Sequence, residues 1–276
     1  MPPFFNMITI GQLLGQATIN KKDARYILMS ILDMDQTQLL TNLQMVLEPE
    51  YVKTFNKMAV CISNKMPLEY VINTAFFMGL TFYVNENVLI PRNDTEILAE
   101  AAIKHINTTN ALTVLDMCTG SGCVLVSLLH YTEAVGVGVD ISPSALDIAK
   151  KNAVKNNVGH KASFILSDMF SDIKQKFDLI VSNPPYIPTA HIPTLEHSVK
   201  AHEPHMALDG GADGLRFYHT LAKEAANFLE PNGTVFMEIG YDQGEAVKEI
   251  CLKAGYDVTI KKDYGGHDRV VIAQMP

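Results

Sequence analysis

The sequence has few of the features that mark a membrane, disulfide-linked or nucleic-acid-binding protein. None of the apolar runs in its 276 residues approaches the ~18 residues that span a bilayer. Its four cysteines form no CxxC pair and no evident disulfide framework, which favours reduced thiols. The net charge is −8 and there is no run of Lys and Arg, so binding to phosphate backbones is not favoured. The composition therefore favours a protein or a small molecule as the substrate.

Two further absences concern location and metal binding. The first residues, Met1–Asn6, lack a basic region and a small-residue cleavage site, so we predict no signal peptide and a cytoplasmic protein. Four histidines lie in the polar stretch 187–213, but their spacing matches no common zinc pattern and no cysteine joins them. We therefore predict no metal site and interpret this stretch as a mobile loop that covers the substrate.

The chain changes character twice, which predicts three parts. Residues 1–66 carry apolar positions at helical spacing and predict a small helical bundle, which we interpret as the part that recognises a partner. Residues 67–91 contain strand-like runs with turn residues Asn85–Asn87 between them, which predicts a β-hairpin linker. In the third part, residues 92–276, Asn93 or Asp94 is expected to cap the first helix.

From Ala111 onward, strand-like and helical segments alternate, which predicts an α/β domain with an open, mostly parallel sheet. A helix over 215–229 is expected to end at Pro231-Asn232-Gly233. The seven expected strands are 112–116, 135–139, 163–166, 178–181, 234–239, 256–260 and 269–273.

Polar residues recur where successive predicted strands end. The first strand runs into Asp116–Gly122, whose small residues would let a ligand approach the backbone, although such a turn can also serve only helix packing. Asp140 ends the second strand, where a carboxylate can accept both hydroxyls of a ribose; alternatively it caps the helix that begins at Ser142-Pro143. Asp168 and Asn183 follow the next two strands. Since ligands bind along the carboxyl edge of open α/β sheets, these positions predict a nucleoside cofactor.

The stretch Asn183–Tyr186 reads Asn-Pro-Pro-Tyr and directly follows a predicted buried strand. Its prolines fix φ and carry no N–H, so the backbone there offers carbonyl acceptors without competing donors. The amide oxygen of Asn183 adds an acceptor, and Tyr186 adds a flat apolar face. Such a group suits a planar NH2, whose two hydrogens need two acceptors; the alternative is a proline-rich turn without function.

These residues together resemble the class I S-adenosylmethionine-dependent methyltransferases. Within them, the chain resembles the HemK-type (PrmC) glutamine methyltransferases that modify peptide chain release factors. The resemblance runs from about Pro67 to the C-terminus and implies a Rossmann-like, seven-stranded sheet; the N-terminal helices fit it more loosely. The stretches that carry it are Pro67–Tyr70, Val88–Arg92, Val114–Cys123, Val139–Pro143, Asn183–Ile187, Glu203–Gly211, Asp213–Leu215, Glu238–Gly240 and Asp268–Val271.

The resemblance also implies a role for each site residue. The methionine part of S-adenosylmethionine would be held by Cys118, Thr119, Gly120, Ser121 and Gly122. Asp140 would hold its ribose, and Asp168 and Met169 would border its adenine. The substrate glutamine would be bound by Asn183, Pro184, Pro185 and Tyr186, and catalysis would rest on Asn183, Pro184 and Tyr186.

The chain departs from the family pattern at three positions. Cys118 and Asn73 stand where the family has glycines, and Asn93 stands where it has a proline. None of these changes removes a polar group that the chemistry needs, so we expect them to affect affinity more than activity.

The predicted function is methylation of the side-chain amide of the glutamine in the Gly-Gly-Gln motif of release factors. We expect a monomer without stable binding to nucleic acid or membrane. Three alternatives stay open. One is a glutamine methyltransferase of a large-subunit ribosomal protein, which shares the Asn-Pro-Pro-Tyr motif. The second is an adenine-N6 nucleic-acid methyltransferase, disfavoured by the acidic balance and by the lack of a recognisable base-reading domain. The third is a non-enzymatic module that has kept the cofactor pocket.

Overall fold

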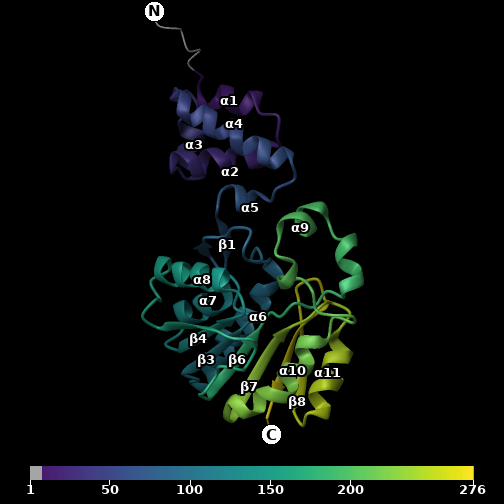
Figure 1. Cartoon of the computed structure of the whole chain (residues 1–276). Coiled ribbons are helices and arrows are strands. Elements are labelled where there is room, and N and C mark those ends of the chain that lie inside the picture. Colours follow the sequence, from purple (N-terminus) through teal and green to yellow (C-terminus); the bar gives the residue numbers. More distant parts are fainter. Residues whose placement is uncertain (1–7, 276) are drawn as a thin grey trace, which may run out of the picture. The chain divides into compact units, whose positions relative to one another are not determined.

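The structure, a computed structural model, describes residues 8–275 (Figure 1). The chain divides into two compact units: the residues up to Asn73 together with His197–His202, and the residues Thr74–Glu196 together with those from Glu203 onward. Between residues 8 and 275, no helix combines the length and apolarity that crossing a membrane requires. The prediction that no signal peptide is present falls on residues 1–6, which lie outside the described part. The roles predicted for the three parts of the chain stay predictions.

The first unit is a bundle of short helices around an apolar core. Thr9 begins the bundle with a capping box, in which its side chain accepts from the Gln12 N–H and the Gln12 side chain accepts from the Thr9 N–H. Among the buried core residues are Ile27, Leu28 and Phe55. Its helices are α1 (Ile10–Gln16), α2 (Lys21–Leu32), α3 (Gln36–Thr41), α4 (Pro49–Ser63), α5 (Leu68–Val71) and α9 (His197–His202).

The hairpin that follows differs in detail from the expected one. Strands β1 (Ala75–Phe77) and β2 (Leu80–Phe82) pair antiparallel. Their turn is Met78-Gly79, where φ is 51° and 73°, as the tight turns that match strand twist require. A turn is present at Asn85–Asn87, as predicted, and the Val88 N–H donates to the Asn85 carbonyl there at 3.2 Å. This turn joins no pair of strands, because the strand expected over residues 88–90 is absent.

The second unit contains the predicted seven-stranded, mostly parallel sheet. The strand order is β5-β4-β3-β6-β7-β9-β8, in which β9 is antiparallel to both neighbours and the other pairs are parallel. The chain runs outward from β3 to β5 and then returns to place β6 beside β3. Ligand sites of open α/β sheets lie at such a reversal of strand order. The strands are β3 (Thr113–Met117), β4 (Val135–Asp140), β5 (Ala162–Leu166), β6 (Phe177–Ser182), β7 (Leu229–Glu238), β8 (Asp257–Lys262) and β9 (Asp268–Gln274).

Helices cover both faces of this sheet, as alternate residues of the central strand show. Leu179 and Val181 of β6 belong to one buried cluster, and Ile180 between them belongs to the other. The helices of the first face are α6 (Asn93–Thr109), α7 (Cys123–Tyr131) and α8 (Pro143–Lys155), and those of the second are α10 (Arg216–Glu224) and α11 (Gly244–Lys253) (Figure 1).

Two expected element ends are wrong. Neither Asn93 nor Asp94 caps α6; the helix follows Arg92, and Asp94 instead pairs with Arg269 at 3.2 Å. The helix expected over 215–229 is divided, because α10 ends at Glu224, the 3-10 turn η3 (Ala225–Phe228) continues it, and Leu229 already belongs to β7. Pro231–Gly233 therefore lie in a bulge of β7, where the register shifts between its first pair and Thr234.

The polar stretch 187–213 contains short helical turns rather than an irregular loop. Besides α9, it contains the 3-10 turns η1 (Thr189–Thr194) and η2 (His205–Ala207). That it is mobile and covers the substrate stays a prediction.

A buried asparagine joins the segment after β2 to α8, which generates a stability prediction. Asn152 is fully buried; its side chain accepts from the Tyr83 N–H at 2.7 Å and donates to the Tyr83 carbonyl at 2.9 Å. The same NH2 donates to the Ser121 carbonyl at 2.9 Å. We expect Asn152→Ala to lower the free energy of unfolding by about 3 kcal/mol, since it removes the side-chain partner of these three backbone groups. Urea unfolding measures the loss, with Lys150→Ala on the exposed side of α8 as the control. Equal stability of the two variants would contradict this role.

Candidate active site

A cavity of about 540 Å³ lies where β3, β4, β5 and β6 end, within the size range of small-molecule sites. Gly122 does not line it: this residue precedes α7 with φ 78°, and a Cβ there would lie 3.0 Å from the Cβ of Ala149, so it serves helix packing. Every other predicted cofactor residue does line it, namely Cys118, Thr119, Gly120, Ser121, Asp140, Asp168, Met169 and Asn183.

The turn after β3 leaves room for a ligand against its backbone. A Cβ built on Gly120 would find only the Cys118 carbonyl oxygen, at 4.0 Å, so this position is open. Cys118 has φ 61°, a left-handed conformation that costs a residue with a side chain about 1 kcal/mol. This explains in physical terms why a glycine suits the position. The cradle therefore fits a ligand that approaches the turn closely.

Asp116, which was not predicted as a site residue, fixes this turn through hydrogen bonds. Its buried carboxylate accepts from the Thr119 hydroxyl at 2.6 Å and from the Leu125 N–H at 3.2 Å, joining the turn to the start of α7. Burial raises its pKa to about 7. A local signal was present, since Asp116 is the one charged residue in a buried strand.

Asp140 connects the loops after β3 and β4. One carboxylate oxygen accepts from the Gly120 N–H and the other from the Ser142 N–H, both at 2.9 Å. The alternative of a helix cap is wrong, because the Ser142 side chain caps α8 by accepting from the Ala145 N–H. Burial raises the pKa of Asp140. Each of its oxygens keeps acceptor capacity toward the cavity, as two ribose hydroxyls would need.

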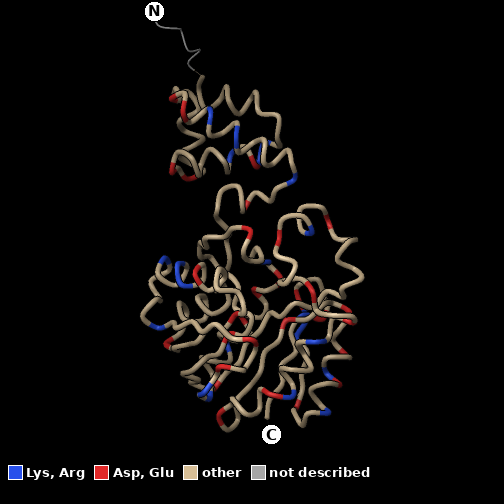
Figure 2. Tube along the Cα trace, in the orientation of Figure 1, with Lys and Arg blue, Asp and Glu red and all other residues tan. Residues whose placement is uncertain are grey.

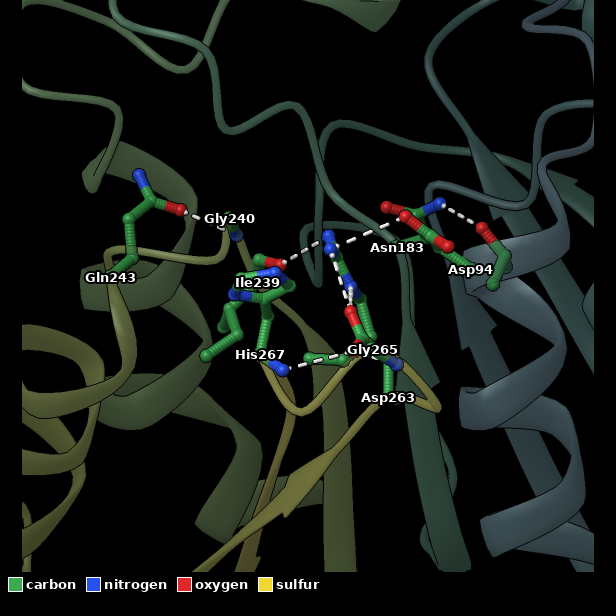
Figure 3. Close-up of polar contacts among 10 residues, drawn as sticks. Asp94, Asn183, Ile239, Gly240, Gln243, Asp263, Gly265 and His267 are labelled. Carbon is green, nitrogen blue, oxygen red and sulfur yellow. Dashed lines mark hydrogen bonds and ion pairs between the residues drawn. The ribbon is translucent and has the colours of Figure 1, made fainter.

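Asn183 is held in one orientation by a residue of α6. Its side-chain NH2 donates to the Thr95 hydroxyl oxygen at 3.1 Å, which leaves the amide oxygen as a free acceptor. Ser182 donates its hydroxyl to the Met117 carbonyl at 2.8 Å and so ties the end of β6 to the end of β3. Figure 3 shows Asn183 beside Asp94, at the start of α6. Thr95 lines the cavity too, although the sequence did not point to it.

The rest of the Asn-Pro-Pro-Tyr stretch is divided between the cavity and its support. Pro185 lines the cavity, whereas Pro184 and Tyr186 do not. Tyr186 packs against the apolar cluster on the second face of the sheet, and burial raises the pKa of its hydroxyl. The structure thus brings Asn183 and Pro185 to the cavity and places Tyr186 where it supports them.

Glycines and a glutamine hold the backbone of this stretch. The Gln243 side chain donates to the Tyr186 carbonyl at 3.0 Å and to the Gly214 carbonyl at 3.3 Å. Gly214 has φ 77°, and a Cβ there would lie 2.3 Å from the Tyr186 carbonyl oxygen. A Cβ on Gly210 would lie 2.8 Å from the Tyr186 Cα. The glycine-rich run 210–214 was the sequence signal for this close approach, whereas Gln243 carried none.

An ion pair fixes the segment that forms another wall of the cavity. The carboxylate of the buried residue Glu203 pairs with Arg92 and accepts from the Ile90 N–H at 3.3 Å. This sets the start of the segment Pro204–Ala207, which lines the cavity together with Phe217. Within residues 8–275, no group of three or more His, Cys, Asp or Glu residues is suited to hold a metal ion, and the absence of a metal stays a prediction.

Comparisons with known proteins identify the family. The family model of the methyltransferase small domain matches residues 92–201, and that of the PrmC N-terminal domain matches residues 9–72. The release factor glutamine methyltransferase of Caulobacter vibrioides is 38% identical over 253 residues, which cover 91% of this chain and 88% of the relative. That of Aquifex aeolicus is 36% identical, covering 98% and 96%. The chain belongs to the release factor glutamine methyltransferase family.

Solved structures support the fold of this family member. The ribosomal protein L11 methylase of Lactobacillus delbrueckii has a TM-score of 0.52 at 20% identity, covering 67% of this chain and 81% of that one. The 16S rRNA N2 G1207 methyltransferase of Thermus thermophilus, solved with AdoMet and guanosine, has a TM-score of 0.50 at 20% identity and covers 74% and 50%. Both likenesses concern the methyltransferase fold alone.

The close approach of Gly214 to Tyr186 generates a second prediction. We expect Gly214→Ala to lower the free energy of unfolding by about 3 kcal/mol or more, because it adds a steric clash to the strain of a positive φ. Gly255→Ala is the matched control, since its φ is 93° and nothing lies within 4 Å of its Cβ position. Strain alone should cost that control about 1 kcal/mol. Urea unfolding of both variants measures the difference, and equal losses would show that the contact with Tyr186 is unimportant.

Proposed function

We propose that this protein transfers the methyl group of S-adenosylmethionine to the side-chain amide nitrogen of the glutamine in the Gly-Gly-Gln motif of peptide chain release factors. One observation carries the proposal: the oriented amide oxygen of Asn183 shares a single cavity with Asp140 and the turn after β3. A nucleoside-bearing methyl donor and an NH2 acceptor site are thus brought together. The relatives match this chain over most of its length and most of their own. Their names support the release factor as the substrate.

Different residues along the cavity would bind different parts of the cofactor. Cys118–Ser121 would hold the methionine part against the open backbone, Asp140 would accept the ribose hydroxyls, and Asp168 with Met169 would border the adenine. When bound, S-adenosylmethionine supplies an electrophilic methyl group on a sulfonium.

The remaining task of the chain is to position a poor nucleophile. A carboxamide nitrogen reacts weakly because its lone pair is delocalised into the carbonyl, so it must be held in line with the methyl group at near-attack distance. Asn183 Oδ1 accepts one hydrogen of the substrate NH2. The acceptor proposed for the other hydrogen is the carbonyl of Pro184, which is buried between the cavity-lining residues Asn183 and Pro185 and to which no described residue donates. Both oxygens also stabilise the positive charge that develops on nitrogen. The methylated nitrogen is acidic enough to lose its proton to water.

The other parts of the chain serve the substrate protein in this proposal. The N-terminal helices recognise the release factor, and the stretch 187–213 covers the bound glutamine. The enzyme acts as a monomer in the cytoplasm, where its substrate works. A nucleic-acid substrate gains no support from charge, because basic and acidic positions are interspersed along the described chain (Figure 2).

Labelled cofactor tests the function directly. The protein is incubated with methyl-labelled S-adenosylmethionine and either a wild-type release factor or one with its Gly-Gly-Gln glutamine replaced by alanine. We expect label on the wild-type release factor and none on the variant. Label on a large-subunit ribosomal protein or on DNA in parallel incubations, with none on the release factor, would replace the proposed substrate. Binding of the cofactor without any transfer would indicate a binding module.

Removal of the amide acceptor should separate turnover from cofactor binding. We expect Asn183→Ala to abolish methyl transfer and to leave the Kd for S-adenosylmethionine within about threefold of wild type, because the acceptor acts on the substrate nitrogen. Isothermal titration and the labelling assay measure the two quantities. Asn107→Ala, on the exposed face of α6, is the control. Loss of cofactor binding in step with turnover would remove Asn183 from its proposed role.

A further inference from the structure

Glu238 is a buried carboxylate that the proposed reaction does not use. It ends β7, is 1% exposed, and accepts hydrogen bonds from the hydroxyls of Thr95 and Tyr186. Its Oε2 atom has no hydrogen-bond partner among the described residues. Burial of a carboxylate costs free energy, and its unmet oxygen adds to that cost. A neutral or apolar side chain would suit a purely structural site better.

The hydrogen-bond chain that starts at Glu238 has a fixed direction. In its ionised form Glu238 can only accept, so the neighbouring Thr95 hydroxyl then turns its single hydrogen toward the carboxylate. The Thr95 oxygen is then an acceptor toward Asn183, whose NH2 lies 3.1 Å away. The amide of Asn183 consequently presents its oxygen, and not its NH2, to the substrate. Without this chain the two amide orientations would differ little in energy, and one of them would repel a substrate NH2.

Tyr186 forms a second arm on the same carboxylate. Its hydroxyl also donates to Glu238, so one buried group contacts Tyr186 directly and Asn183 through Thr95. These are two of the four residues of the Asn-Pro-Pro-Tyr stretch.

A buried arginine connects the segments that carry Thr95 and Glu238. Arg269 of β9 lies 3.2 Å from the Asp94 carboxylate and 3.1 Å from that of Asp263, and it donates to the Ile239 carbonyl at 3.3 Å. It thereby ties the start of α6, where Thr95 lies, to the end of β7 (Figure 3). Its positive charge faces Glu238 from β9 and lowers the pKa of that carboxyl, whereas the negative charge of Asp94 on α6 raises it. The other titratable groups that face Glu238 are Cys123 of α7, Tyr218 of α10 and Tyr186 after β6.

We propose that Glu238 is a positioning residue, which acts through Thr95 to set the amide orientation of Asn183 and so selects an NH2-bearing side chain over one that carries only oxygen acceptors. This inference rests on the proposed function for the identity of the substrate. The orientation of Asn183 itself belongs to the free protein and can be measured without turnover.

The test compares variants that change one hydrogen bond at a time. Thr95→Val removes the hydroxyl at nearly constant shape, Thr95→Ser restores it, and Glu238→Gln replaces the obligatory acceptor by an amide. We expect Thr95→Val and Glu238→Gln each to lower kcat about 100-fold, with KM for S-adenosylmethionine changed less than about threefold. Thr95→Ser should recover most of the rate. In the double variant Thr95→Val with Glu238→Gln, kcat should fall little below that of either single variant, because the two residues act as one chain.

A second readout is independent of activity. Heteronuclear NMR of the side-chain amides identifies the Asn183 NH2 as the pair of signals that disappears in Asn183→Ala. We expect these signals to exchange slowly in the wild type and to change with pH as Glu238 titrates. The pH dependence should vanish in Glu238→Gln, and Thr95→Val should give fast exchange.

Stability against pH supplies the third readout, with a defined sign. Burial raises the pKa of Glu238 from 4.5 to about 7, so between these values the folded protein holds a proton that the unfolded chain has lost. Wild-type stability therefore falls as pH rises through that window. Glu238→Gln lacks this contribution to the slope and should gain relative stability from about pH 5 to about pH 8.

The possible outcomes separate this inference from the proposed function. If the wild type methylates no release factor but the NMR pattern is as described, the substrate is wrong and the positioning role stands. If the wild type methylates release factor while Thr95→Val keeps its kcat and its slow Asn183 exchange, the positioning role is wrong. A Thr95→Ser protein that folds but is as slow as Thr95→Val would also overturn it.

Discussion

The parallel pairing of β3 with β6 is the constraint on which the site depends. The chain passes through β4 and β5 before it returns, so the turns after β3 and β6 come together although they are about 65 residues apart. The Ser182 hydroxyl fixes their distance by its bond to the Met117 carbonyl. The turn proposed to hold the cofactor follows Met117, and Asn183, the proposed amide acceptor, follows Ser182. Sheet topology therefore brings the two parts of the proposed site together, before any loop is considered.

The same edge of the sheet concentrates features that cost stability. The carboxylates of Asp116 and Glu238 are almost fully buried, and burial raises both pKa values to about 7. Cys118 and Met169 adopt positive φ values, 61° and 48°. Functional sites accumulate such features, because the packed sheet beside them supplies the free energy that keeps them folded. Here each buried carboxylate accepts hydrogen bonds from residues that line the cavity or support it.

The alternation of strand and helix in the sequence was enough to predict the sheet, its strands and the edge where the cavity lies. It also brought out Asp140 and Asn183, since each directly follows a run of buried residues. Contacts between segments that are far apart in the sequence could not be predicted, because a local residue pattern contains no information about them. Thr95 reads as an ordinary residue in the first turn of a helix, and Gln243 reads as a residue before another. Asn85–Asn87 do form a turn, but local turn chemistry did not show that the two paired strands meet at Met78-Gly79 instead.

The proposed acceptor is an asparagine, and this explains why residues that do not contact the substrate matter to the proposed site. An aspartate at position 183 could accept the same hydrogen bond, but its charge would favour an ammonium group over a neutral carboxamide. A neutral amide avoids that preference, yet it is ambiguous, since its two ends differ only by a rotation. Thr95 removes the ambiguity only if its own hydrogen is committed elsewhere, and Glu238 commits it. In the proposed reaction, selectivity for a glutamine side chain thus depends on a carboxyl group that is buried two hydrogen bonds away from the substrate.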